Sequence, residues 1–381
     1  MTTRHDTTRH DTTRHDTTRA SNMELLRIVA MIGIITYHIY CHCMIQQLTY
    51  SHLIDQRGNE YFCNPNFSEK LLLLVTLSPL GLVGNAIFIL ISGYFMVEKK
   101  PDQIDISSIA IKLLSQLFVA ICVLMIGSNV LHMLSPNTSF TLLTFNEINS
   151  MNWFVGYYFL VMVIARVFLQ GWLSRVDKKT HAILCICLFA LVQFSWSRGV
   201  LDGTIGGAPD LCTGIFLYSL GGYIRKYNPF GRLKMRDVII VLGFLFVLIY
   251  MNFYTATQNA IINYDPNSGR FIQSLPGYSN VQFIPLCMGI VIFEIFRRVR
   301  IGYSKVINYV GSATLMMYLL HDNNFVRGLF HKTDWITMLH DDIPRFMLVL
   351  GVWTVGICIA GVVVYAMYGV LANMVRRRWE A

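Results

Sequence analysis

The stretch Ser21–His42, SNMELLRIVAMIGIITYHIYCH, decides the fold of this chain. Its apolar run predicts a helix that crosses a membrane, yet it contains Arg27 and His38, which a hydrocarbon core accepts only at a cost. Their separation of eleven residues comes within about 20° of three full turns, so both side chains lie on one face. They are about 16 Å apart along the axis, roughly half a hydrocarbon core. We therefore expect a guanidinium near one membrane surface in line with an imidazole near the midplane, which indicates a functional site.

The composition of the whole chain also indicates a membrane protein. Of 381 residues, 54% are hydrophobic and 14% are charged, whereas a soluble domain carries about 25% charged residues. The mean hydropathy is +0.49. Successive apolar runs predict an all-α polytopic membrane protein with ten transmembrane helices. The expected helices cover about residues 24–44, 71–97, 106–134, 151–170, 181–197, 208–224, 237–256, 281–296, 305–321 and 345–371.

The basic residues indicate how these helices are oriented. With the N-terminus inside, 23 of the 31 Lys and Arg residues fall in inner segments and 7 in outer segments, while Arg166 lies within a helix. Inner loops of membrane proteins carry such an excess. We therefore expect both termini to be cytoplasmic. The net charge of +9 reflects this alternation and not a groove for nucleic acid.

The chain divides into three segments. Residues 1–21 contain repeats of TTRHD, which are polar and too short to bury a core, so we expect a disordered tail. Residues 22–375 hold the ten-helix domain, and residues 376–381 form a basic cytoplasmic tail. Ser21 and Glu24 have the spacing of a capping box, which would start the first helix. No small-residue cleavage site follows the first apolar run, so we expect no cleavable signal peptide.

The cysteines give little chemical information. Eight of the nine lie in or beside apolar runs, where Cys behaves as a small hydrophobic residue. Cys185 and Cys187 would point about 200° apart on a helix, which makes a poor metal chelate. Cys63, in the first outer loop, has Cys41 and Cys43 as disulfide partners in principle, and the sequence leaves that pairing open.

Each residue of the pair in the first helix allows two interpretations. His38 is either a neutral packing residue or a general base that takes the proton of a hydroxyl. His42, one turn further, would join it at a metal site, but no third ligand is evident nearby, so we expect no metal. Arg27 is either an anchor that snorkels to the surface and pairs with Glu24, or the charged half of a functional pair.

Four segments together resemble the signature of the membrane acyltransferase-3 family. Each is weak alone, but they occur in the family's order and span the chain from about Ser21 to about residue 375. The segments are Arg27 and His38 in a helix opening NMELLRI, FILISGYF at residues 88–95, Trp153-Phe154 with Tyr157 and Tyr158, and Tyr318-Leu-Leu-His321.

The resemblance implies an integral-membrane O-acyltransferase of a bacterial inner membrane. Such enzymes move an acyl group, commonly acetyl, from cytoplasmic acyl-CoA to a hydroxyl of a cell-envelope carbohydrate such as a polysaccharide or a lipid-linked oligosaccharide. Arg27 would bind the CoA phosphates through charge-assisted hydrogen bonds. The pantetheine arm would then bring the thioester to His38, which acts as base or acyl relay. The implied partners are acyl-CoA, the glycan and the bilayer, without nucleic acid or metal.

The resemblance also implies further binding residues. Ser92 and Gly93 mark either a close approach of the backbone to CoA or helix packing through small residues. Lys112 would be a second phosphate contact, although the family's second basic residue is replaced here by Ser115. The residues expected to contact the acceptor are Tyr157, Tyr158 and His321. His321 and the adjacent Asp322, at the outer end of the helix at 305–321, would guide the acceptor or otherwise mark the membrane interface.

Two other classes of function compete with the enzyme. A transporter or flippase of an envelope precursor would also have many helices and buried polar residues, but it usually shows internal repeats with paired broken helices. This sequence shows no such repeat. A catalytically inactive scaffold of the same fold would be indicated by loss of Arg27 or His38, and both are present.

Overall fold

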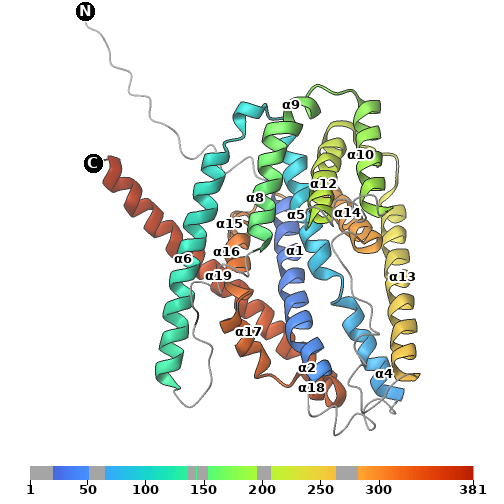
Figure 1. Cartoon of the computed structure of the whole chain (residues 1–381), viewed down its shortest axis with the longest axis vertical. Helices are drawn as coiled ribbons and strands as arrows, with labels where there is room; N and C mark the ends of the chain where they lie inside the picture. Colours follow the sequence, from blue (N-terminus) through green and yellow to red (C-terminus); the bar gives the residue numbers. More distant parts are fainter. Residues whose placement is uncertain are drawn as a thin grey trace, which may run out of the picture.

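The computed structural model describes residues 20–50, 65–135, 143, 153–194, 207–262 and 282–380. These residues form helices, and no strand occurs among them (Figure 1). The longer helices are α1 (Ser21–Ile39), α5 (Leu80–Met96), α6 (Ile106–Leu134), α8 (Trp153–Ile164), α10 (Lys178–Gln193), α12 (Ala208–Tyr227), α13 (Met235–Ile262), α14 (Phe283–Arg298) and α19 (Ile343–Glu380). The shorter ones are α2 (Ile45–Tyr50), α4 (Pro65–Leu71), α9 (Gln170–Leu173), α15 (Lys305–Ser312), α16 (Thr314–His321), α17 (Asn324–His331) and α18 (Trp335–Asp341). Two π-helical turns, η2 (Tyr40–Met44) and η5 (Ala165–Leu169), and two 3₁₀ turns, η3 (Leu72–Thr76) and η4 (Pro101–Gln103), complete the set.

Helix α1 packs against helices from both halves of the chain, namely α5, α14, α15, α16 and α19. Its buried face carries large aliphatic side chains such as Leu26 and Ile34. Its first turn is fixed to the C-terminal half, because the Ser21 hydroxyl donates to Asn308 Oδ1 (3.2 Å) and accepts from the Ser304 N–H (2.9 Å). Helix α1, which carries Arg27 and His38, therefore has one face buried inside the protein and not against lipid.

Glycines allow α5 and α12 to cross closely. A Cβ atom added at Gly93 would overlap the backbone of Tyr218, and one added at Gly221 would overlap the carbonyl of Leu90. Small residues at such crossings let two backbones approach within van der Waals contact. This crossing holds α12 firmly against α5.

The loops that the sequence assigns to the cytoplasm meet at one end of the bundle. Arg225, at the end of α12, pairs with Glu98 after α5 at 3.0 Å. The Lys226 ammonium donates to the carbonyl of Leu173, at the end of α9, at 2.8 Å. These contacts join three loops that are far apart in sequence, as the predicted alternation of the helices requires.

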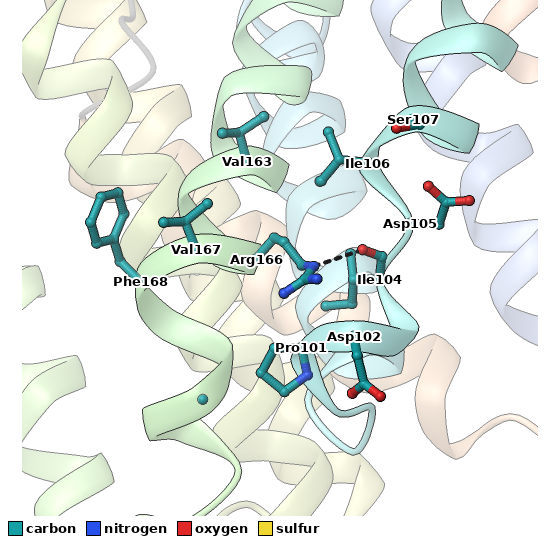
Figure 2. Close-up of a pocket in the computed structure, with 11 residues that line it drawn as sticks. Pro101, Asp102, Ile104, Asp105, Ile106, Ser107, Val163, Arg166, Val167 and Phe168 are labelled. Carbon is teal, nitrogen blue, oxygen red and sulfur yellow. Dashed lines mark hydrogen bonds between the residues drawn. The ribbon is translucent and has the colours of Figure 1, made fainter.

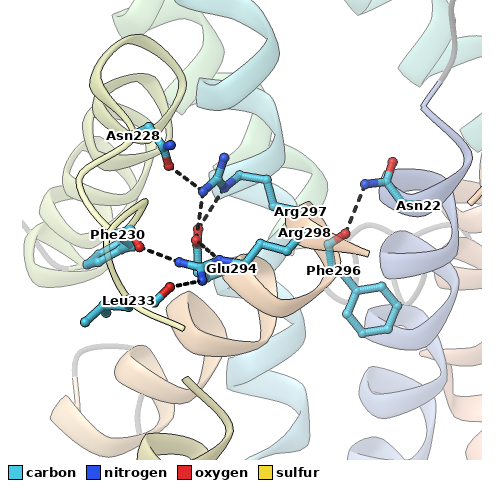
Figure 3. Close-up of polar contacts among 8 residues, drawn as sticks. All are labelled: Asn22, Asn228, Phe230, Leu233, Glu294, Phe296, Arg297 and Arg298. Atoms are coloured by element: carbon cyan, nitrogen blue, oxygen red, sulfur yellow. Dashed lines mark hydrogen bonds and ion pairs between the residues drawn. The ribbon is translucent and has the colours of Figure 1, made fainter. Parts of the chain in front are cut away.

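A buried carboxylate ties α14 to the same end (Figure 3). Glu294 is 2% exposed and accepts from Arg297 Nε at 2.8 Å and from Arg298 Nε at 2.5 Å. Arg297 also donates to Asn228 Oδ1, and Arg298 to the carbonyl of Leu233, both at 2.6 Å. A buried carboxylate needs such partners to offset its desolvation. Both arginines therefore hold the turn between α12 and α13 in place.

The segment 322–344, between the helices expected at 305–321 and 345–371, contains the helices α17 and α18. Side-chain caps start both of them: Asn323 accepts from the Val326 N–H (3.0 Å) and Asp334 from the Thr337 N–H (3.2 Å). Trp335 is fully buried beneath them. With α2 and α4 they gather at the lower end of Figure 1, opposite α9.

Five helices among the described residues are long and apolar enough to cross a membrane: Ser21–Gln47, Pro101–Leu134, Trp153–Leu173, Met235–Asn259 and Ile343–Arg378. Leu80–Met96 is apolar but shorter. Outward side chains on α6, α13 and α19 are large and apolar, among them Phe118, Ile126, Phe244, Leu348 and Ile359. Such faces suit contact with hydrocarbon. The fold is thus all-helical with several spans, and the number ten stays a prediction.

Three local expectations need correction. Ala20 and not Ser21 is the N-cap of α1, because the Ser21 hydroxyl bonds the start of α15 and Glu24 pairs with Arg27. The helix expected at 305–321 breaks at Ala313 into α15 and α16. Helix α19 continues through the basic tail to its last described residue. The helix expected at about 71–97 is interrupted before α5, which has Pro79 as its N-cap. The TTRHD repeats and Cys63 lie outside the described residues.

Candidate active site

His38 on α1 and His321 on α16 are in direct contact. Nδ1 of His38 lies 2.8 Å from Nε2 of His321, and the rings stack with centroids 4.9 Å apart. Nδ1 of His321 lies 3.0 Å from the carbonyl of Met317, which can only accept, so His321 carries its proton on Nδ1. Its Nε2 then accepts from the Nδ1–H of His38. These two hydrogen bonds leave Nε2 of His38 unprotonated with a free lone pair, as a general base requires.

Asp322 adds a carboxylate beside both histidines of the first helix. Its Oδ2 lies 3.7 Å from Nδ1 of His38, and its Oδ1 lies 3.7 Å from Nε2 of His42. The residue is 3% exposed, and Arg327 donates to Oδ1 through Nε (3.1 Å) and Nη2 (2.5 Å). The guanidinium balances the buried carboxylate. The carboxylate in turn favours a positive charge that develops on His38.

Local backbone features place these groups. The π-helical turn η2 begins two residues after His38, and the rings of His38 and His42 remain in contact, with centroids 5.4 Å apart. Such turns are frequent at functional sites. Asn323 caps α17 directly after α16, which turns the chain and brings Arg327 back to Asp322. The site is thus built from the last turn of α1 with η2 and from the junction of α16 with α17.

The sequence identified His38 and His321 separately, and the fold brings them together. It does not predict that Asp322 lies beside His38 or that Arg327 pairs with Asp322. The signals were positional: Asp322 directly follows the segment that ends at His321, and Arg327 lies five residues further on. The five-residue spacing places Arg327 beside Asp322 only because α17 begins between them.

Arg27 lies on α1 between His38 and the end where the basic loops meet. Its Nη1 donates to Glu24 Oε1 at 2.7 Å, and its side chain is 28% exposed. The second oxygen of Glu24 is buried without a hydrogen-bond partner among the described residues. The ion pair fits an anchor, and the exposed part of the guanidinium also leaves donors for a ligand. Binding of CoA by Arg27 therefore stays a prediction.

Ser92, Gly93, Tyr157 and Tyr158 all lie where α5, α8 and α12 meet. The Ser92 hydroxyl donates to a main-chain carbonyl one turn back (3.0 Å), and its oxygen lies 3.3 Å from the Tyr158 hydroxyl. The Tyr157 hydroxyl donates to the carbonyl of Asp210 at 3.1 Å. These contacts show a part in helix packing. The expected roles in binding CoA or the acceptor stay predictions.

A hollow of about 710 Å³ lies beside the first turn of α6 (Figure 2). Arg166, on η5, lines it and donates through Nε to the carbonyl of Ile104 at 2.9 Å. Asp102 and Asp105 line it as well, so two carboxylates oppose one guanidinium and the charge does not favour phosphate. Lys112 is exposed further along α6 and is not part of the lining.

Comparison with known proteins identifies the family of this chain. The family model Acyl_transf_3, described as an acyltransferase domain, matches residues 21–371 and so includes every element of the site. No curated protein and no solved structure matches the chain. Since the matched region is nearly the whole sequence, the chain belongs to the acyltransferase-3 family.

Proposed function

We propose that this protein is a membrane O-acyltransferase that moves an acyl group, with acetyl as the default, from cytoplasmic acyl-CoA to a hydroxyl of a cell-envelope carbohydrate. It acts in a bacterial inner membrane, which it crosses ten times with both termini in the cytoplasm. Family membership supports acyl transfer, and the gathering of the basic loops at one end supports the orientation. The observation that carries the reaction is the hydrogen bond from His38 to His321 beside the Asp322–Arg327 pair.

The acceptor hydroxyl binds with its proton toward Nε2 of His38. As the oxygen attacks the thioester carbonyl, Nε2 takes the proton, and the imidazolium is favoured by Asp322 at 3.7 Å. The tetrahedral intermediate collapses with cleavage of the carbon–sulfur bond. The CoA thiolate leaves and takes the proton back from His38. The products are the acyl ester and CoA thiol, and His38 returns to its initial tautomer.

The donor approaches along α1 from the end that carries the basic loops. Arg27 faces that end, so its guanidinium binds a CoA phosphate through charge-assisted hydrogen bonds. The flexible pantetheine arm spans the distance of about 16 Å between Arg27 and His38. The acceptor reaches His38 from the opposite end, where α17 and α18 lie beside α2.

The direct test is transfer of labelled acetyl from acetyl-CoA by the purified protein to a mixture of envelope glycans. We expect labelled ester, released by mild base, on one glycan fraction. The experiment includes a metal chelator and a parallel assay in vesicles with a lipid-linked sugar. Movement of the sugar across the bilayer, without CoA binding or ester formation, would favour the transporter and overturn the proposal.

A further inference from the structure

The fold supplies the third ligand that the sequence lacked for a metal site. One ligand atom from each of His38, His42 and Asp322 lies within 4.8 Å of the other two. His38 Nδ1 lies 3.7 Å from Oδ2 of Asp322, and His42 Nε2 lies 3.7 Å from its other oxygen, Oδ1. Donor atoms of a tetrahedral zinc site with bonds of about 2.1 Å lie about 3.4 Å apart, so small rotations of the side chains would close the site.

The surroundings of these ligands also fit a metal. Ligating carboxylates are normally held by a hydrogen bond from a neighbour, and Arg327 does this at Oδ1 while Oδ2 faces His38. Nε2 of His321 lies 2.8 Å from Nδ1 of His38. Nδ1 of His321 bonds the carbonyl of Met317, and histidines that ligate metals are usually held by such a second hydrogen bond. His42 is 24% exposed, which leaves access for an ion.

We propose that His38, His42 and Asp322 bind a divalent transition metal ion, for which zinc is the probe, and that its binding inhibits acyl transfer. The second part rests on the proposed function. A metal on Nδ1 of His38 displaces the ring proton to Nε2. That nitrogen then donates instead of accepting, so the base loses the lone pair that takes the acceptor's proton. Because Arg327 already balances Asp322, we expect reversible binding, weaker than at a structural zinc site.

The test measures zinc binding separately from turnover. Full-length protein without an added histidine tag is titrated with zinc against a chromophoric chelator, as wild type, His42→Gln and the control His132→Gln. The control removes an exposed histidine of α6, outside the site. His5, His10 and His15 of the tail are present in every variant and cancel in the comparison.

We expect the wild type and the control to bind one zinc more tightly than His42→Gln, by more than about tenfold, since loss of even a supporting residue costs about ten- to hundredfold. With chelator, His42→Gln should transfer acetyl at the wild-type rate. With zinc, the wild type should be inhibited at concentrations about tenfold lower than the variant.

Equal zinc affinity of wild type and His42→Gln would overturn the site, as would a monodisperse Asp322→Asn protein with wild-type affinity. Tight binding without loss of transfer, or with a gain, would overturn the inhibition and leave the site. If no variant transfers acetyl at all, the proposed function fails, while the chelator titration still decides whether the metal site exists.

Discussion

The hydrogen bond between His38 and His321 can be tested by replacing the residue that accepts it. His321→Leu fills a similar volume but leaves the Nδ1–H of His38 without Nε2 as partner. An unsatisfied buried donor costs about 1–3 kcal/mol, and each 1.36 kcal/mol is a factor of about ten in rate. If this free energy shifts His38 into its other tautomer, transfer should fall by about five- to 150-fold. His321→Gln keeps an oxygen acceptor near the same place and should retain most of the rate.

The assay for this prediction is the initial rate of label transfer at saturating acetyl-CoA, in chelator, with CoA binding measured in parallel. Binding of CoA should be unchanged in both variants, because no predicted CoA contact is altered. Size-exclusion chromatography checks that each variant is folded, since His321 is 1% exposed. A wild-type rate for folded His321→Leu, or an equal loss in His321→Gln, would refute the tautomer argument.

Three further predictions address the donor site, the helix crossing and the buried ion pair. Arg27→Gln should weaken acyl-CoA binding by about ten- to 150-fold in an equilibrium binding assay, since a lost charge-assisted hydrogen bond is worth about 1.5–3 kcal/mol. An unchanged affinity would mean that Arg27 is only a surface anchor paired with Glu24. Gly93→Ala should lower the free energy of unfolding by about 1–3 kcal/mol or more in a denaturation series, because the added Cβ meets the backbone of α12. The control Gly243→Ala has open space around it and should not destabilise the protein. Similar unfolding curves for the two variants would contradict the close crossing of α5 and α12. Arg327→Met should lower the free energy of unfolding by about 3–5 kcal/mol, because it leaves the buried carboxylate of Asp322 unpaired. Adding Asp322→Asn to this variant should restore part of that stability. Strictly additive effects of the two substitutions would argue against the ion pair.

Much of the architecture could be predicted from the sequence because a bilayer imposes strong patterns. Apolar length located α6, α13 and α19. The charges of the loops predict which loops share one end of the bundle, and the Arg225–Glu98 contact joins two of those loops. These signals are local or averaged over many residues, so they do not depend on tertiary contacts.

The rest depended on contacts between distant residues. The start of α1 was assigned wrongly because the Ser21 hydroxyl bonds α15, 287 residues away at Asn308, instead of its own helix. The helices α17 and α18 are too short to show a helical period in the sequence, and burial of Trp335 against other elements is not visible there. For the same reason the sequence could name His38 but not Asp322 as its neighbour.

The central claim is that His38 is the base, and one comparison tests it most directly. Wild type and His38→Ala are measured for CoA binding and for acetyl transfer to the identified glycan, with chelator present. The account predicts that His38→Ala binds CoA like the wild type and loses transfer by about a hundredfold or more, the contribution of a positioned general base. A folded His38→Ala protein that keeps most of its transfer activity would contradict the account.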